Sequence, residues 1–173
     1  MHEQSSSTSK RKRCVIGGFM GTGKTTIGRL LSKKLDIPFL DMDEELTERW
    51  GGIHLQFKRD GEDVFRGRER SLALSLAASV EPIVIATGGG VFASLAQLEA
   101  FGAQATTISL TASFSTLSSR VQGGGDRPLW NADAEALFLT RGAAYACADF
   151  VVDTESRPLE EVVEELFHIM NRV

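Results

Sequence analysis

Residues 18–25 of the chain read GFMGTGKT and follow a short apolar run, Cys14-Val15-Ile16. They fit the phosphate-binding P-loop pattern G-x-x-x-x-G-K-[ST], and a helical pattern follows them, as the motif requires. In such a loop, successive backbone N–H groups point at an anion, and the next helix presents the positive end of its dipole there. Lys24 would add a charge for the outer phosphates, and the Thr25 hydroxyl would hold Mg2+. We therefore expect a nucleotide site that includes Gly21, Thr22, Gly23, Lys24, Thr25 and Thr26.

The rest of the chain alternates short apolar runs with longer helical patterns. This alternation predicts a doubly wound α/β fold, in which a parallel five-stranded sheet is flanked by helices on both faces. A length of 173 residues, 42% of them hydrophobic, fits one such domain, and we expect it to span residues 13–173 after a disordered tail over residues 1–12. Strands are predicted at 14–16, 38–41, 83–86, 105–110 and 150–152, and helices at 24–35, between 43 and 79, and at 94–101, 113–121, 133–148 and 159–170.

Composition and residue spacing argue against several classes of protein. The net charge of −4 argues against a general nucleic-acid binder, and we expect the basic run at residues 10–13 to be a solvated lead-in to the first strand. Cys14 and Cys147 form no C-x-x-C pair and are expected to be reduced core thiols of a cytoplasmic protein. The three histidines are too scattered for a zinc site. No apolar stretch is long enough to span a bilayer, so we expect no membrane partner.

Polar and flexible residues follow the second and third predicted strands, where ligands of such sheets bind. Asp41 and Asp43 lie two residues apart and would repel each other unless a cation or a donor lies between them, which favours Mg2+ and a substrate hydroxyl as partners. Alternatively, Asp43 caps the helix that follows. The glycines at positions 88, 89 and 90 contribute no packing, which favours close approach of a ligand to the main chain over an ordinary flexible loop.

Arg66 and Arg141 both lie in predicted helices. For Arg66, a pair with Glu62 four residues earlier would make it a surface charge. Arg141 lies in an otherwise apolar helix, where an arginine is costly unless it meets an anion. The residues alone therefore make only Arg141 a candidate for binding an anion.

Several of these features occur in the order found in shikimate kinases, and the chain resembles that family from Val15 to Met170. The features are the P-loop followed by TIGRLL, the two aspartates, Phe65-Arg66, the glycine turn, DRPL at residues 126–129 and Arg141-x-x-x-Tyr145. The resemblance implies a P-loop fold like that of nucleoside monophosphate kinases, with a mobile lid at about residues 121–132. It also implies transfer of the γ-phosphoryl group of ATP to the 3-hydroxyl of shikimate, with Mg2+, in aromatic amino-acid biosynthesis.

The resemblance implies a role for each matching residue of the nucleotide half. Lys24 and Thr25 would bind phosphate and Mg2+, and Asp41 would sit near the metal. Arg127 would reach in from the lid, whose glycine-rich residues 122–126 suit a closing flap, although a static exposed loop is the alternative. Arg120 would pack near adenine.

In the acceptor half, the resemblance makes Asp43 the acceptor of hydrogen bonds from the shikimate hydroxyls, including the one that attacks. Arg66 and Arg141 would grip the substrate carboxylate, and Gly88, Gly89 and Gly90 would line the same pocket. Lys24, Asp43 and Arg127 are thus the expected catalytic residues.

Two segments depart from the family pattern, and both belong to the acceptor half. Residues 50–54 read WGGIH and lack the serine of the usual Thr-Gly-x-Ser-Ile turn, and residues 141–146 read RGAAYA instead of Arg-x-Pro-Leu-Tyr and a basic residue. Three functions therefore stay open: a monomeric shikimate kinase, a related sensing or regulatory domain with little turnover, and a kinase for another small hydroxy acid such as gluconate.

Overall fold

The structure is a computed structural model that describes residues 13–122 and 133–173. The expected disordered tail over residues 1–12 and residues 123–132 of the expected lid lie outside the described residues, and so does Arg127. Within the described part of the chain, no helix is long and apolar enough to cross a membrane.

The described residues form one parallel sheet of five strands, in the order β2-β3-β1-β4-β5. The register places Val15 of the central strand opposite Ile85 on one side and Thr107 on the other. The prediction of a doubly wound parallel sheet is therefore confirmed. The strands are β1 (Arg13–Gly18), β2 (Phe39–Asp41), β3 (Ile83–Ala86), β4 (Thr106–Thr111) and β5 (Phe150–Asp153).

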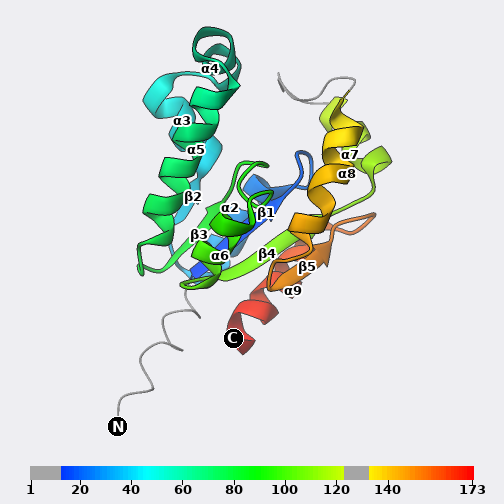
Figure 1. Cartoon of the computed structure of the whole chain (residues 1–173). Helices are drawn as coiled ribbons and strands as arrows, with labels where there is room; N and C mark the ends of the chain where they lie inside the picture. The colour runs from blue at the N-terminus through cyan, green and yellow to red at the C-terminus, as the bar shows by residue number, and fades with distance from the viewer. Residues whose placement is uncertain (1–12, 123–132) are drawn as a thin grey trace.

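Helices cover both faces of the sheet and rise above the edge where the strands end (Figure 1). In that view α3, α4 and α5 stand on one side of the molecule, and α7 and α8 stand on the other. The helices are α2 (Lys24–Leu35), α3 (Met42–Trp50), α4 (Ile53–Asp60), α5 (Glu62–Ala77), α6 (Leu95–Gly102), α7 (Phe114–Gln122), α8 (Ala134–Tyr145) and α9 (Leu159–Arg172).

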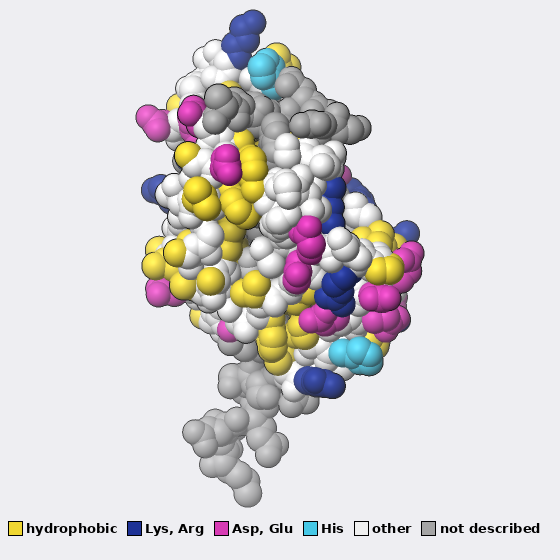
Figure 2. Space-filling view, turned by 90° about the vertical axis from the view of Figure 1, so that its right-hand side faces the viewer, with side chains coloured by type: hydrophobic (Ala, Val, Ile, Leu, Met, Phe, Trp, Pro, Cys, Tyr) yellow, Lys and Arg dark blue, Asp and Glu magenta, His cyan; other side chains and the backbone are white. Residues whose placement is uncertain are grey.

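The central strand separates two hydrophobic cores, because successive side chains of a strand point to opposite faces. Val15 belongs to the core formed with α3, α5 and α6, whereas Cys14 and Ile16 belong to the core formed with α2 and α9. All six residues of β1 are buried. On the outer side shown in Figure 2, acidic, basic and apolar side chains lie next to one another.

Three local predictions were wrong. Helix α3 begins at Met42, two residues earlier than a cap at Asp43 requires, so Asp41 and not Asp43 is its N-cap, and the Asp41 carboxylate accepts from the N–H groups of Asp43 and Glu44. Cys147 follows the end of α8 and is exposed, whereas Cys14 is buried as expected and its pKa is raised by burial.

The third wrong prediction concerns Arg13, which we expected to be solvated and which is buried at the start of β1. Its guanidinium donates to the backbone oxygens of Glu81 at 2.6 Å and Leu76 at 2.8 Å. It therefore binds carbonyl groups near the end of α5, and its burial lowers its pKa. Carbonyl partners allow this arginine to be buried next to the sheet.

Candidate active site

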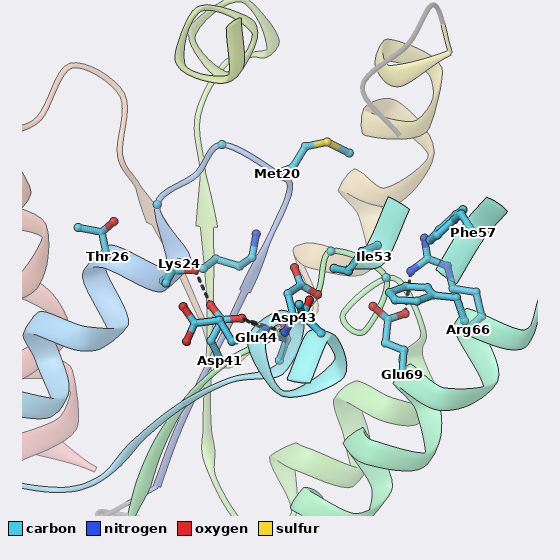
Figure 3. Close-up of a pocket in the computed structure, with 18 of the residues that line it drawn as sticks. Met20, Lys24, Thr26, Asp41, Asp43, Glu44, Ile53, Phe57, Arg66 and Glu69 are labelled. Atoms are coloured by element: carbon cyan, nitrogen blue, oxygen red, sulfur yellow. Dashed lines mark hydrogen bonds and ion pairs between the residues drawn. The ribbon is translucent and has the colours of Figure 1, made fainter. Parts of the chain in front are cut away.

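A cavity of about 800 Å³ lies beyond the carboxyl ends of the strands, where ligands bind in this fold. Figure 3 shows Lys24 and Asp41 at one end of it and Arg66 and Glu69 at the other, with Asp43 between them. The structure thus brings together residues predicted from six separate stretches of the sequence. The predicted residues that line it are Gly21, Gly23, Lys24, Thr25, Thr26, Asp41, Asp43, Arg66, Gly89, Gly90, Arg120 and Arg141.

Two predicted residues lie behind the cavity wall. Thr22 is buried, and its hydroxyl donates to the backbone oxygen of Phe19 at 2.8 Å, so it shapes the loop from within. Gly88 packs against side chains, since a Cβ built there would lie 2.3 Å from Oε1 of Glu69 and 3.0 Å from Oδ1 of Asp43.

The phosphate-binding loop depends on glycine at two positions that line the cavity. Gly21 and Gly23 have φ angles of 87° and 94°, which residues with a side chain rarely adopt. The first helical hydrogen bond runs from the N–H of Ile27 to the oxygen of Gly23, so α2 begins directly at the loop. The ammonium group of Lys24 donates to the backbone oxygen of Phe19 at 2.9 Å and thereby lies over the loop. This arrangement is typical of an anion-binding helix terminus.

Oxygen atoms suited to a small divalent cation lie next to the loop. The Thr25 hydroxyl donates to Oδ2 of Asp41 at 2.5 Å. Mg2+ prefers oxygen ligands and is usually held by one or two carboxylates together with substrate phosphates, so these two residues fit it. Among the described residues, no three His, Cys, Asp or Glu side chains gather into a complete metal cage. A metal at this place would therefore depend on a phosphate ligand as well.

Asp43 lies in an environment that disfavours its charge. Burial raises its pKa to about 6, and the nearby Asp41 carboxylate adds to the rise, whereas the ammonium group of Lys24 opposes it. A carboxylate with this pKa is mostly ionised at neutral pH and can accept a hydrogen bond or a proton from a hydroxyl group. Its position between the two ends of the cavity suits a group that acts on a second substrate.

Arg66 lies at the end of the cavity opposite Lys24, held by two carboxylates and two rings. Its Nη1 donates to Oε2 of the buried Glu69 at 2.8 Å, and the predicted pair with Glu62 is present at 3.3 Å. The guanidinium carbon also lies 5.2 Å from the ring centre of Phe65 and 5.9 Å from that of Phe57. The arginine is thus fixed at the cavity wall rather than free on the surface.

Sequence reasoning missed three residues at this end, namely Glu69, Phe57 and Phe65. Each lines the cavity, and Glu69 is only 3% exposed. A carboxylate three residues after an arginine on a helix was the available signal for Glu69. Phe65 entered the family pattern only as the neighbour of Arg66, Phe57 belongs to no motif, and the packing of α4 against α5 places both here.

The glycine turn lies against the arginines of the cavity. A Cβ built on Gly90 would lie 2.5 Å from Nη1 of Arg66, and one built on Gly89 would lie 3.2 Å from Nη1 of Arg141. The glycines therefore let the main chain approach both guanidinium groups closely. Arg141 comes from α8, so the two arginines reach this place from opposite sides of the molecule.

Arg120 lies at the nucleotide end and comes from α7. It donates to the hydroxyl of Thr154 at 3.0 Å and to the backbone oxygen of the same residue at 2.8 Å. These bonds hold the guanidinium at the edge of the cavity beside the loop after β5.

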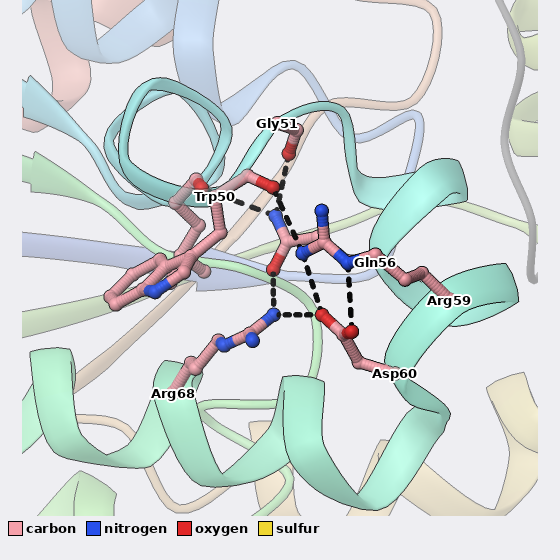
Figure 4. Close-up of polar contacts among 7 residues, drawn as sticks. Trp50, Gly51, Gln56, Arg59, Asp60 and Arg68 are labelled. Atoms are coloured by element: carbon pink, nitrogen blue, oxygen red, sulfur yellow. Dashed lines mark hydrogen bonds and ion pairs between the residues drawn. The ribbon is translucent and has the colours of Figure 1, made fainter.

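The turn between α3 and α4, which departs from the family pattern, is held by a buried amide (Figure 4). Gln56 is fully buried, and its Nε2 donates to the backbone oxygens of Leu46 at 3.1 Å and Gly51 at 2.7 Å. Its oxygen accepts from Arg68 at 3.0 Å, and Arg68 also pairs with Asp60 at 2.8 Å. One side chain thus joins α3, the turn, α4 and α5.

This network lies behind the acceptor end of the cavity. Ile53 and Phe57 line the cavity and flank Gln56 in the sequence of α4. Gly52 is the N-cap of α4 and makes no side-chain cap bond, so the turn is held instead by the bonds from Gln56 to carbonyl oxygens of α3 and of the turn itself. His54, on the same helix, is exposed, as expected for a residue beside a turn.

Known proteins match this chain over a range that includes the residues at both ends of the cavity. A family model described as "Shikimate kinase" matches residues 20–171. The shikimate kinase of Geobacter sulfurreducens is 37% identical over 164 residues, which cover 91% of this chain and 90% of that protein. The crystal structure of shikimate kinase from Aquifex aeolicus matches with a TM-score of 0.81 at 35% identity, covering 92% of this chain and 96% of that one. Shikimate kinase from Acinetobacter baumannii in complex with shikimate matches with a TM-score of 0.85 at 25% identity, covering 96% and 97% of the two chains.

Proposed function

Since the chain belongs to the shikimate kinase family, we propose that its cavity is where the γ-phosphoryl group of ATP is transferred to the 3-hydroxyl of shikimate. The chain is a small-molecule kinase of aromatic amino-acid biosynthesis, and ATP is its co-substrate. One observation carries the proposal: a single cavity has a phosphate-binding loop at one end and two arginines at the other, with Asp43 between them. Shikimate carries one carboxylate and several hydroxyls, which match these groups.

The donor half would bind the nucleotide through the loop and α2. Backbone N–H groups would bind the phosphates, Lys24 would neutralise the outer ones, and Arg120 would lie beside adenine. Mg2+ would be held by Thr25 and Asp41 together with ATP, and when bound it neutralises charge on the phosphates. Arg127, which lies outside the described residues, would contact the transferred group. The contributing loop and helix residues are Gly21, Thr22, Gly23, Lys24, Thr25 and Thr26.

The acceptor half would hold shikimate by its carboxylate and orient its hydroxyls. Arg66 and Arg141 would bind the carboxylate, because guanidinium groups match its planar geometry. The glycine turn at residues 88–90 would let the main chain approach the ring. Asp43 would accept a hydrogen bond from the attacking hydroxyl. Its raised pKa, about 6, makes it a better proton acceptor than an ordinary aspartate.

Catalysis would then consist mainly of positioning and charge neutralisation. The shikimate oxygen forms a bond to the γ-phosphorus as the bond to the β,γ-bridging oxygen breaks, and ADP leaves. The hydroxyl proton passes to the carboxylate of Asp43. Lys24 and Arg127 would stabilise the charge that develops on the transferred oxygens. We also propose that the chain acts as a monomer in the cytoplasm. ATP, the co-substrate, is available in that compartment.

A coupled assay of ADP release tests the proposed function, with shikimate, quinate and gluconate compared at equal concentrations. We expect saturable release with shikimate and little with the other two. ADP release that does not exceed the rate without acceptor would contradict the proposal. If calorimetry detects binding of shikimate but no ADP is released, the result would instead support the alternative function, a sensing or regulatory domain with little turnover.

Arg141→Ala tests the acceptor assignment in the same assay. It should raise the shikimate KM or abolish activity while the affinity for ATP stays unchanged. An equal loss of both affinities would contradict the assignment of Arg141 to the acceptor.

A further inference from the structure

Tyr145 lies at the wall of the acceptor half and has no role in the proposed function so far. It ends α8 and follows Arg141 by four residues, so both side chains lie on the same face of the helix. It is the only tyrosine of the chain, and it is 8% exposed. A buried phenol needs a hydrogen-bond partner, because an unpaired one is costly.

That partner is the main chain of the glycine turn. The Tyr145 hydroxyl donates to the backbone oxygen of Gly89 at 2.7 Å, across 56 residues of sequence. A Cβ built on Gly89 would lie 3.8 Å from this hydroxyl oxygen and 3.2 Å from Nη1 of Arg141. The phenol, the guanidinium and the glycine backbone therefore meet at one place.

The phenol has the protonation state that this contact needs. Burial raises the pKa of Tyr145, whereas the charge of Arg141 and a hydrogen bond from it oppose the rise. The hydroxyl is therefore protonated at neutral pH, so it can donate to Gly89 while its oxygen accepts from Arg141.

We infer that Tyr145 is a positioning residue for the acceptor, which holds the backbone of Gly89 and the guanidinium of Arg141 at a fixed spacing. The peptide unit is planar and trans, so fixing the oxygen of Gly89 also fixes the direction of the N–H of Gly90. Glycines have wide backbone freedom, and an arginine side chain has many rotamers. One hydroxyl thus restrains two groups that would otherwise have to be ordered by the substrate.

This inference rests on the proposed function, in which Gly89 and Arg141 bind the acceptor. The hydroxyl should affect the two substrates differently, because Lys24 and Asp41, which would bind the phosphates and Mg2+, lie at the other end of the cavity. Losing the hydroxyl should weaken the binding of shikimate equally in the ground state and in the transition state. A change of that kind raises KM and leaves kcat nearly unchanged.

Tyr145→Phe removes only the hydroxyl and is the first test. We expect the shikimate KM to rise about 3- to 10-fold, the effect of one neutral hydrogen bond, with kcat changed less than about twofold and the ATP KM unchanged. The matched control is Thr140→Val, which removes an exposed hydroxyl on the same helix that bonds to the backbone oxygen of Ala136. That control should leave both KM values unchanged. An unchanged shikimate KM in Tyr145→Phe, or an equal rise for ATP, would overturn the inference.

A second test needs no substitution. Because the chain has one tyrosine, a fluorine label on tyrosine gives a single NMR resonance, which reports on Tyr145. The full-length chain is labelled with 3-fluorotyrosine, and its 19F spectrum is recorded with shikimate or with ATP. We expect shikimate alone to shift the resonance. We also expect it to raise the pKa of the labelled phenol, since a carboxylate paired with Arg141 cancels the charge that lowers this pKa.

The two tests distinguish failure of the inference from failure of the proposed function. If the unmodified chain turns over shikimate but the resonance does not move, the inference fails and the function stands. If there is no turnover but shikimate shifts the resonance, the function fails and the placement of Tyr145 at an acceptor site is supported. If shikimate causes neither turnover nor a shift, both are overturned.

Discussion

The Thr25 hydroxyl reaches Oδ2 of Asp41 at 2.5 Å, although the strands that precede them, β1 and β2, are separated in the sheet by β3. If this pair holds Mg2+, Asp41→Asn should raise the Mg2+ concentration needed for half-maximal activity by about tenfold or more. A lost charge-assisted contact is worth about 1.5–3 kcal/mol, which corresponds to such a factor. The measurement is ADP release over a range of Mg2+ concentrations at saturating substrates.

The N-cap role of Asp41 supplies the control for this prediction. Asparagine caps a helix as well as aspartate does, so Asp41→Asn should keep the free energy of unfolding of the metal-free chain nearly unchanged. Asp41→Ala should also lose the cap, at a cost of about 1 kcal/mol. An unchanged Mg2+ dependence in both variants would contradict the metal assignment.

Asp43→Asn should stabilise the ligand-free chain at pH 7 while it abolishes turnover. Burial raises the pKa of Asp43 from 3.8 to about 6, so the folded state disfavours the ionised carboxylate that is present at neutral pH. A shift of about two units corresponds to roughly 2–3 kcal/mol, which the neutral amide would recover. Urea denaturation at pH 7 measures this gain in the free energy of unfolding.

The sign of the pH dependence provides a check on the same residue. Because the folded pKa lies above the unfolded one, the contribution of Asp43 to stability increases as the pH falls from about 7 to about 4. The stability difference between wild type and Asp43→Asn should therefore shrink over that range. Glu45→Gln, which removes a partly exposed charge paired with Arg49 on the same helix, should change stability by less than about 1 kcal/mol. If the difference in free energy of unfolding between wild type and Asp43→Asn stays constant from pH 7 to pH 4, ionisation of Asp43 does not destabilise the folded chain.

Gln56→Leu should loosen the acceptor half. It removes the hydrogen bonds to Leu46, Gly51 and Arg68 and leaves buried carbonyl groups unpaired, so the free energy of unfolding should fall by about 1–3 kcal/mol. The shikimate KM should rise as Ile53 and Phe57 shift, and the ATP KM should not. Steady-state kinetics well below the melting temperature measures both constants.

Gln97→Leu is the matched control for this substitution. Gln97 is a buried glutamine on α6, and its side-chain oxygen has no hydrogen-bond partner among the described residues. Its replacement should be nearly neutral for stability and for both KM values. A similar rise in shikimate KM for both variants would show that the effect is general loosening rather than the position of α4.

Gly90→Ala should impair use of the acceptor without unfolding the chain. The added Cβ would meet Nη1 of Arg66 at 2.5 Å and Oε2 of Glu69 at 2.6 Å, so this ion pair must move. We expect the shikimate KM to rise about tenfold, as for loss of one charge-assisted contact, with ATP binding unchanged. Gly142→Ala, where a Cβ meets no atom within 4 Å of the described structure, should leave kinetics unchanged and add about 0.5–1 kcal/mol to stability. Equal kinetics of the two variants would argue against close packing of the glycine turn on the arginine.

The strand ends could be predicted from the sequence because each is marked by its own residues. The GKT of the loop, Asp41 with Asp43, and the three glycines all follow apolar runs, and a parallel sheet necessarily brings such ends to one edge. The order of the strands in the sheet was not predicted. That order decides which strand ends, and so which site residues, are neighbours. Arg66 and Arg141 were recognised as a pair by resemblance rather than by spacing, since 75 residues separate them.

What could not be predicted depends on packing between distant elements. Arg13 looks like part of a basic run, and only the position of Leu76 and Glu81 at the end of α5 supplies its carbonyl partners. Gln56 stands between Leu55 and Phe57 and belongs to no motif, and its burial follows from the approach of three helices. Asp41 rather than Asp43 became the N-cap because α3 begins two residues earlier than a cap at Asp43 requires.

The central place of β1 has a consequence for how the chain opens. A strand paired on both sides exchanges its amide hydrogens only when the whole sheet comes apart, whereas edge strands exchange through smaller local openings. The loop at residues 18–25 continues from β1, but Asp41 ends β2, a three-residue edge strand, and Asp43 follows it. A local opening at β2 would therefore move the two aspartates while the loop at residues 18–25 keeps its shape.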